Sequence, residues 1–349
     1  MKVAIAGAGI AGGYLARLLE QNDIHPDLYD CIDHRTACKC RSCGWGAPTD
    51  IRRYLSSVDL DLADYLMNTM GDVNFDGIVA KTPLCTINKP RLLQDLTWGQ
   101  KVQDHHILPG EMDTYDVLVD ATGIARALLP PCKSDLTLPT LQYRVSAESR
   151  NGDRLEAGVY GEQIPGLGYV WVFPLAKNQF HIGVGGIGLE RKEDILERFF
   201  SEMTDRFVFT PLCSCCGVVR VASPYYSTPF YSYRHRSDGT VQPVIGVGES
   251  IGTVSPFTGE GIVYSLQCAK ILSDLWPDEK AYASKVLSTF GWMKKERETI
   301  DYLLFEGRKT GPRLRDRWRF FRNAQRSQIG LPIIEAFRRM GSLSSWLEE

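Results

Sequence analysis

The stretch Val3-Ala-Ile-Ala-Gly7-Ala-Gly9-Ile-Ala-Gly12 decides how the amino-terminal part of the chain folds. Its glycines form a G-x-G-x-x-G pattern, which allows a tight turn, close approach of a pyrophosphate and close packing of a helix. The apolar run before Gly7 predicts a buried strand, and apolar residues at helical spacing after Gly12 predict a helix. Asp30 follows 18 residues after Gly12, where a carboxylate that binds a ribose is expected. Together these features predict a dinucleotide site.

Composition narrows the class of protein. The 349 residues carry a formal net charge of -2, which does not favour a nucleic-acid partner. No window reaches the ~18 to 20 apolar residues that a spanning helix needs. Arg17 and Glu20 interrupt the first apolar run, which argues against a secretion signal. We therefore expect a cytoplasmic protein, or one that lies peripherally at a membrane surface.

Two later segments also have the sequence pattern of strands in a nucleotide-binding sheet. The run from Tyr115 predicts a buried strand that ends in Asp120-Ala-Thr-Gly123. The run from Pro243 predicts another, which leads through Gly248-Glu249 and Pro256-x-x-Gly259-x-Gly261 into a helix from Ile262 to Leu275. The nucleotide-binding part is thus expected to be discontinuous.

The segment between these runs is expected to be mainly antiparallel sheet. In Gly168–Pro174 the period of two places Tyr169, Trp171 and Phe173 on one face of a strand, which pairs as a hairpin with Gln179–Gly185. Residues 193–203 are predicted to be helical, and Asp238-Gly239 is a hairpin turn signal. Earlier in the chain we expect helices over residues 50–70 and from about Pro90.

The predicted fold is α/β, a discontinuous Rossmann-type dinucleotide-binding domain with an inserted, mainly antiparallel β-sheet domain and a helical carboxy-terminal region. The boundaries are 1–137 and 241–277 for the dinucleotide-binding domain, 138–240 for the sheet domain, and 278–349 for the helices.

The order of these motifs is that of FAD enzymes of the p-hydroxybenzoate hydroxylase fold. Within that group the chain resembles the geranylgeranyl reductase family, because Cys43-Gly44-x-Gly46 follows the second strand and Tyr169-x-Trp171-x-Phe173-Pro174 lies in the sheet. The resemblance spans about residues 1 to 275. Thr122 departs from it, since many relatives carry there the Asp of an Asp-Gly motif associated with NADPH-using hydroxylases.

The resemblance implies an FAD cofactor and assigns its contacts. It places Gly7, Gly9, Ala11 and Gly12 at the pyrophosphate, Asp30 at the adenosine ribose, Val102 at the adenine, Arg91 at the phosphate or ribityl region, Glu249 at the ribityl hydroxyl, and Cys43, Gly44, Gly46, Gly259, Gly261 and Ile262 around the isoalloxazine.

The resemblance further implies saturation of carbon–carbon double bonds in a hydrophobic isoprenoid chain. Hydride transfer to an isolated alkene also needs a proton donor and a water-poor pocket. Cys43 and Tyr169 are the candidate catalytic donors, and Trp171 is expected beside them in the wall of a tunnel for the chain. The electron donor is expected to be a small protein or a reduced nicotinamide. The alternatives are a monooxygenase or halogenase of the same fold, and a flavin/thiol protein that passes electrons to a protein partner.

Ten cysteines include the clusters Cys38-x-Cys40-x-x-Cys43 and Cys213-x-Cys215-Cys216. Neither has the paired C-x-x-C spacing of a structural zinc site, so no metal site is predicted. A thiol–disulfide pair near the flavin remains an alternative interpretation.

The carboxy-terminal region is basic. Residues 291–349 hold 13 Lys and Arg against 8 Asp and Glu. Between Arg313 and Arg326, the residues Leu314, Trp318 and Phe321 share a helix face flanked by arginines, which suits either contact with an anionic membrane surface or a solvated basic face over a packed apolar stripe.

Overall fold

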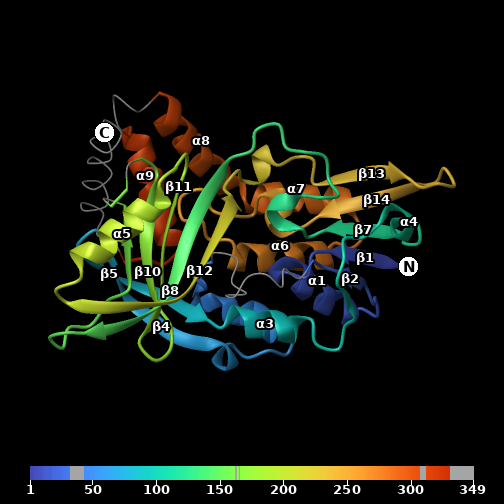
Figure 1. Ribbon diagram of the computed structural model, residues 1–349. Helices are drawn as coiled ribbons and strands as arrows, with labels where there is room; N and C mark the ends of the chain where they lie inside the picture. Colours follow the sequence, from blue (N-terminus) through green and yellow to red (C-terminus); the bar gives the residue numbers. More distant parts are fainter. Residues whose placement is uncertain (32–42, 162, 165, 307–311, 331–349) are drawn as a thin grey trace.

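The fold contains a parallel sheet that is extended at one edge and a second, larger sheet. It is seen in a computed structural model that describes residues 1–31, 43–161, 163–164, 166–306 and 312–330. Figure 1 shows the first sheet on one side of the molecule with α1, α6 and α7, and the second sheet on the other side with α5. The α/β class and the discontinuous Rossmann-type arrangement predicted from the sequence are confirmed.

The first sheet carries the nucleotide-binding pattern. Its strand order is β13-β14-β7-β1-β2-β6, and every pair is parallel except β13–β14. The strands are β1 (Val3–Ala6), β2 (Asp27–Tyr29), β6 (Val102–Gln103), β7 (Val117–Asp120), β13 (Tyr231–His235) and β14 (Val241–Gly246). All residues of β1 and β7 are buried, as expected for strands covered on both faces.

Helices cover this sheet and begin where the glycine motifs predict. Helix α1 (Ile10–Glu20) follows the first glycine turn and packs on α6 (Ile262–Asp274), which follows the last one. Helix α3 (Lys89–Leu96) begins after Asn88, whose side chain accepts the backbone N–H of Arg91, and Pro90 occupies its first turn. The short helix α4 (Pro109–Met112) precedes β7.

The second sheet has the order β12-β8-β11-β10-β9-β4-β5-β3 and is antiparallel except between β9 and β4. Its strands are β3 (Gly46–Pro48), β4 (Leu66–Phe75), β5 (Ile78–Ile87), β8 (Thr137–Ser149), β9 (Gly158–Tyr160), β10 (Gly168–Pro174), β11 (Gln179–Gly186) and β12 (Phe207–Arg220). The predicted β10–β11 hairpin and the turn at Asp238-Gly239 are confirmed, as is the predicted helix, seen as α5 (Lys192–Glu202).

The predicted helix over residues 50–70 is largely wrong. The segment forms the short helices η1 (Thr49–Ile51), α2 (Arg52–Ser56) and η2 (Leu62–Asp64), and then enters β4. Strands β4 and β5 form a hairpin around Asp76 and Gly77, both at positive φ (47° and 89°). Residues 46–87 thus contribute three strands to the second sheet, although the sequence assigns them to the FAD-binding part; the domain boundaries remain a prediction.

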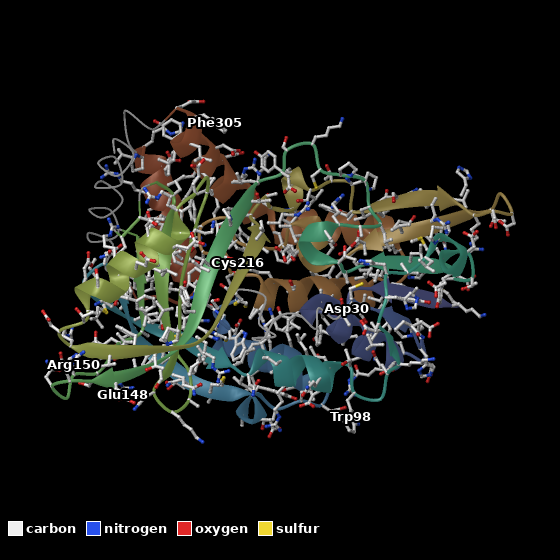
Figure 2. All side chains as sticks on the ribbon, viewed as in Figure 1. Asp30, Trp98, Glu148, Arg150, Cys216 and Phe305 are labelled. Atoms are coloured by element: carbon white, nitrogen blue, oxygen red, sulfur yellow. The ribbon has the colours of Figure 1, made fainter. Side chains whose placement is uncertain are left out.

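The carboxy-terminal part is helical as far as it is described. Helices α7 (Glu279–Thr289), α8 (Gly291–Phe305) and α9 (Leu314–Arg326) follow α6. Phe305, at the end of α8, is 80% exposed and points away from the body of the molecule (Figure 2). Among residues that the structure describes, no helix combines the length and the apolar character that crossing a membrane requires.

Candidate active site

A cavity of about 1590 Å³ joins the two sheets. It begins at the carboxyl ends of β1 and β7, where dinucleotides bind in folds of this type. It continues past the Cys43–Gly46 segment and the face of β10 to residues of α8 and α9. All predicted site residues line it except Gly12 and Arg91. The structure therefore brings together most of the positions that the sequence singles out.

The first glycine turn forms a cradle that excludes side chains. Gly7 has φ 102°, and a Cβ there would lie 2.3 Å from the carbonyl oxygen of Ala121. A Cβ on Gly12 would lie 1.9 Å from the carbonyl oxygen of Gly7, so Gly12 serves the packing of α1 against the turn. A Cβ on Gly9 would meet no atom of the described chain within 4 Å, because Gly9 faces the cavity. The open N-terminus of α1 therefore fits a pyrophosphate.

The expected ribose and adenine positions lie at neighbouring strand ends. Asp30 directly follows β2, its backbone N–H donates to the carbonyl of Gln103 (3.0 Å), and both Asp30 and Val102 line the cavity. His105 and His106 line the cavity as well, and no motif in the sequence indicates them. His105 is held by Glu111 at 3.0 Å.

At the start of α3 the structure favours a different cation from the predicted one. Arg91 lies outside the described cavity lining; its side chain is 53% exposed and forms a weak ion pair with Asp95 (3.9 Å). Lys89, two residues earlier, lines the cavity, and its charge opposes the rise that burial causes in the pKa of the Glu249 carboxyl. A basic residue of α3 thus lines the cavity, but this residue is Lys89 and not Arg91.

Glu249 lies where the two halves of the chain meet. It belongs to η5 (Gly248–Ile251) and accepts the backbone N–H of Arg220 at 2.8 Å. Burial raises the pKa of Glu249, and the Arg220 bond and the charge of Lys89 oppose that rise. Asp120 of the Asp-Ala-Thr-Gly motif instead accepts bonds from Thr122, Leu128 and Leu129, which orders the turn after β7.

The Cys43–Gly46 segment presses against the aromatic face of β10. A Cβ on Gly44 or Gly46 would lie 2.5 or 2.9 Å from the Phe173 ring. Trp45 between them has φ 60°, a strained conformation for a bulky residue. Its ring packs edge-on against His181, with centroids 4.5 Å apart, and burial lowers the pKa of His181 to about 4. A neutral imidazole therefore supports the loop at neutral pH.

Gln142 of β8 connects the predicted catalytic residues. It accepts the indole N–H of Trp171 at 3.1 Å and donates to the carbonyl of Cys43 at 3.3 Å. No pattern in the sequence identifies it. One buried amide therefore positions both the tunnel wall and the segment expected beside the flavin.

Tyr169 connects β10 to the last glycine turn. Its hydroxyl donates to the carbonyl of Thr258, directly before Gly259, whose φ is 63°. Burial, and next the charge of Glu260, raise the pKa of Tyr169. Because the hydroxyl proton is already bonded, Tyr169 is better suited to hold the turn than to give up a proton.

Beyond these residues the cavity wall becomes apolar. The expected aromatic residues Tyr169, Trp171 and Phe173 all line it. Strands β4 and β5 contribute Met70 and Leu84. Helices α8 and α9 contribute a further group, Ile300, Leu303, Phe320 and Ala324. Helices α8 and α9 thus contribute mainly apolar side chains to the lining, together with Asn323 of α9.

The cysteine clusters are described only in part, since Cys38 and Cys40 lie outside the described residues. Cys213 is disulfide-bonded, whereas Cys43 and Cys216 are free thiols. Figure 2 shows Cys216 on the second sheet, and it lines the cavity. In the described segments no group of three or more His, Cys, Asp or Glu side chains is arranged to hold a metal ion.

The predicted apolar face of α9 is split. Leu314 and Trp318 are 75% and 48% exposed, whereas Phe321 is buried and contacts Trp318. Arg313 and Arg319 lie near the buried Asp316 (2.8 and 3.6 Å), so part of the basic charge is engaged within the protein.

Comparison with known proteins gives distant relatives. No family model matches the chain. An uncharacterized protein of Methanocaldococcus jannaschii is 25% identical over 86% of this chain and 91% of its own length. Digeranylgeranylglycerophospholipid reductase 1 of Methanopyrus kandleri is 27% identical, but the match spans 46% of this chain and 41% of the reductase. The chain resembles the geranylgeranyl reductases.

Solved structures agree on the fold. A geranylgeranyl bacteriochlorophyll reductase-like protein of Thermoplasma acidophilum has a TM-score of 0.62 and 16% identity, covering 98% of this chain and 91% of that one. A tryptophan 6-halogenase of Streptomyces toxytricini has a TM-score of 0.56 and 15% identity, covering 86% and 78%. The fold is therefore that of FAD-binding Rossmann-type oxidoreductases, and the glycine cradle fits that cofactor.

Proposed function

We propose that the protein is an FAD-dependent reductase that saturates carbon–carbon double bonds of an isoprenoid chain. The observation that carries the proposal is the continuity of the cavity, which joins a pyrophosphate cradle at Gly9 to an apolar chamber walled by Tyr169, Trp171 and Phe173. The match to a digeranylgeranylglycerophospholipid reductase supports the same substrate class. FAD would lie along Gly7–Gly9, Asp30 and Glu249, with its reactive end toward Cys43 and Gly261.

When reduced, the bound flavin would supply a hydride to the alkene. The protein must then exclude water and deliver a proton, since an isolated alkene cannot stabilise the charge that hydride addition leaves. The apolar wall and the packing of Phe173 against Gly44 and Gly46 serve the first need. Cys43, a free thiol in the lining, is one candidate for the second.

One experiment distinguishes the proposed reductase from its alternatives. Anaerobically reduced enzyme is mixed with a geranylgeranyl glycerolipid, with oxygen plus an aromatic substrate, or with a small redox protein. Flavin reoxidation with gain of two hydrogens per double bond in the lipid supports the reductase. Reoxidation only by oxygen with modification of the aromatic supports a monooxygenase or halogenase, and reoxidation only by the redox protein supports an electron-transfer protein.

The catalytic thiol is tested by Cys43→Ala, with Cys216→Ala as a matched control because Cys216 is also a free cysteine in the cavity lining. If the Cys43 thiol delivers that proton, Cys43→Ala slows lipid reduction by about 10²-fold or more at unchanged FAD content. Equal turnover in the two variants would remove Cys43 from the mechanism.

Two partner proposals accompany the reductase. The electron donor, a small protein or a reduced nicotinamide, is identified by which of them reduces the flavin anaerobically. Peripheral contact with an anionic membrane through Leu314 and Trp318 is tested by sedimentation with phosphatidylglycerol vesicles, using Trp318→Ala as the comparison. Binding that is independent of lipid charge and of Trp318 would contradict the membrane proposal.

A further inference from the structure

Glu260 lies between the main cavity and a second, smaller one. The second cavity has a volume of about 220 Å³, enough for several water molecules, and Glu260 lines both. The second cavity is also lined by Asp50, Arg53, Tyr264, Gln267, Trp292 and Arg326. The flanking glycines Gly259 and Gly261 line the main cavity.

Glu260 is partly buried, and its carboxyl is incompletely paired. Its Oε1 atom has no hydrogen-bond partner among the described residues, while the Tyr264 hydroxyl bonds the carboxyl. A buried carboxylate oxygen without a donor is costly, whereas a protonated carboxyl is tolerated more easily. The backbone around it is well held, since the Glu260 carbonyl accepts the N–H of Ser255 at 2.9 Å.

The surroundings of Glu260 favour its protonated form. Burial, and then the negative charges of Asp50 and Glu296, raise the pKa of Glu260 to about 8. The titratable and charged groups around it are Asp50, Arg53, Tyr169, Tyr264, Glu296 and Arg326. Of these, Glu296 is itself held by Ser255 (2.9 Å) and Asn323 (2.5 Å) and lies outside both cavity linings.

We propose that Glu260 carries the proton that alkene reduction consumes from the second cavity into the main one. The Glu260 O–H bond breaks as a C–H bond forms on the substrate carbon, while the other hydrogen and both electrons arrive as the hydride of the reduced cofactor. The resulting carboxylate then takes a proton from water in the second cavity. Each double bond saturated therefore draws one proton from solvent. This assignment rests on the proposed reductase function.

The first test needs no turnover. Infrared spectra of the oxidised holoenzyme are recorded across pH for wild type, Glu260→Gln and Glu296→Gln, in H2O and D2O. We expect a protonated-carboxyl band that disappears as pH rises through about 8, shifts in D2O, is missing in Glu260→Gln and persists in Glu296→Gln. If the Glu260→Gln spectrum keeps every protonated-carboxyl band of the wild type, the proposal is overturned.

The second test uses lipid reduction. Glu260→Gln should lower the rate about 10²-fold or more, while dithionite still reduces its flavin at the wild-type rate. Glu260→Asp, which keeps a carboxyl, should reduce lipid faster than Glu260→Gln, and its rate should again fall at high pH. Glu296→Gln should keep the rate, with the decline moved to lower pH because a charge that raises the pKa of Glu260 is gone.

The two proposals fail in different ways. If wild-type enzyme reduces no lipid, the reductase function fails, and with it the role of Glu260 in that reaction, whatever the infrared result. If wild-type enzyme reduces lipid and Glu260→Gln does so at the same rate, only the proton assignment is overturned.

Discussion

The indole N–H of Trp171 donates to the side-chain oxygen of Gln142 at 3.1 Å, and the same amide donates to the carbonyl of Cys43. The three residues come from β10, β8 and the Cys43–Gly46 segment, so one side chain holds three parts of the site together. Replacing Gln142 by Leu leaves a buried indole N–H without an acceptor. We expect a loss of about 1–3 kcal/mol in the free energy of unfolding, measured by urea denaturation.

The control for this prediction is a double-mutant cycle. Trp171→Phe removes the donor, so Gln142→Leu should cost less in that background than in wild type. Additive losses would show that the Trp171–Gln142 bond does not stabilise the site.

Two glycines of the first turn should respond differently to Ala. A Cβ on Gly12 would overlap the carbonyl of Gly7, so Gly12→Ala should lower both stability and FAD content. Gly9 is at φ -74° with open space beyond it, so Gly9→Ala should fold normally. The added methyl group would nevertheless occupy the cavity surface where the pyrophosphate is expected to bind.

We therefore expect Gly9→Ala to weaken FAD binding at least tenfold, or about 1.4 kcal/mol, at an unchanged melting temperature. The measurements are FAD titration followed by fluorescence and thermal unfolding without cofactor. Gly71→Ala is the matched control, since its Cβ would also meet no described atom within 4 Å and Gly71 lies outside the cavity lining. Wild-type affinity for FAD in Gly9→Ala would contradict the proposal that the pyrophosphate binds against Gly9.

The basic residues at the start of α3 provide a third prediction. Lys89 lines the cavity and acts on Glu249, whereas Arg91 lies outside it near Asp95. Lys89→Met should weaken FAD binding about tenfold and reduce its dependence on salt, while Arg91→Met should change it little. The opposite result would support the cofactor contact that the family resemblance implies for Arg91.

Local patterns predicted much of this molecule because they report on neighbouring residues. The glycine turn before α1, the β10–β11 hairpin and the start of α6 each depend on a few consecutive side chains. The β4–β5 hairpin has such a signal as well, Asp76-Gly77, but its partly exposed strands lack a buried apolar run. The sequence therefore does not predict this hairpin.

The rest of the site depends on contacts between distant segments. Gln142 reaches Cys43 across 99 positions of the chain, and nothing near either residue indicates the bond. Lys89 and Arg91 are both basic residues in the first turn of α3, and only Lys89 lines the cavity. Glu260 lies inside a glycine motif that is visible in the sequence. The small cavity that Glu260 also lines is formed partly by residues at the end of α9, so only the folded chain shows it.

The last prediction concerns stability against pH. Burial raises the pKa of Glu260 from 4.5 to about 8 and that of Glu296 from 4.5 to about 7. The folded state therefore holds protons that the unfolded state releases, and the stability that these carboxyls contribute is full below about pH 4.5 and is lost as pH rises toward 7 and 8. The slope is at most ~1.4 kcal/mol per pH unit for each carboxyl. His181 acts oppositely, since its pKa is lowered to about 4 and its contribution is lost as pH falls below 6.5.

Urea unfolding of the cofactor-free protein between pH 5 and 8 separates these groups. The free energy of unfolding of Glu260→Gln relative to wild type should rise with pH across this range, and that of Glu296→Gln should rise mainly below pH 7. Loss of hydrogen bonds from Ser255 or Asn323 in Glu296→Gln would lower stability at every pH without changing that slope. If the wild-type and Glu260→Gln curves are parallel, Glu260 is ionised in the folded protein. A carboxyl lowers the free energy of unfolding as pH rises through this range only when it is protonated in the folded state.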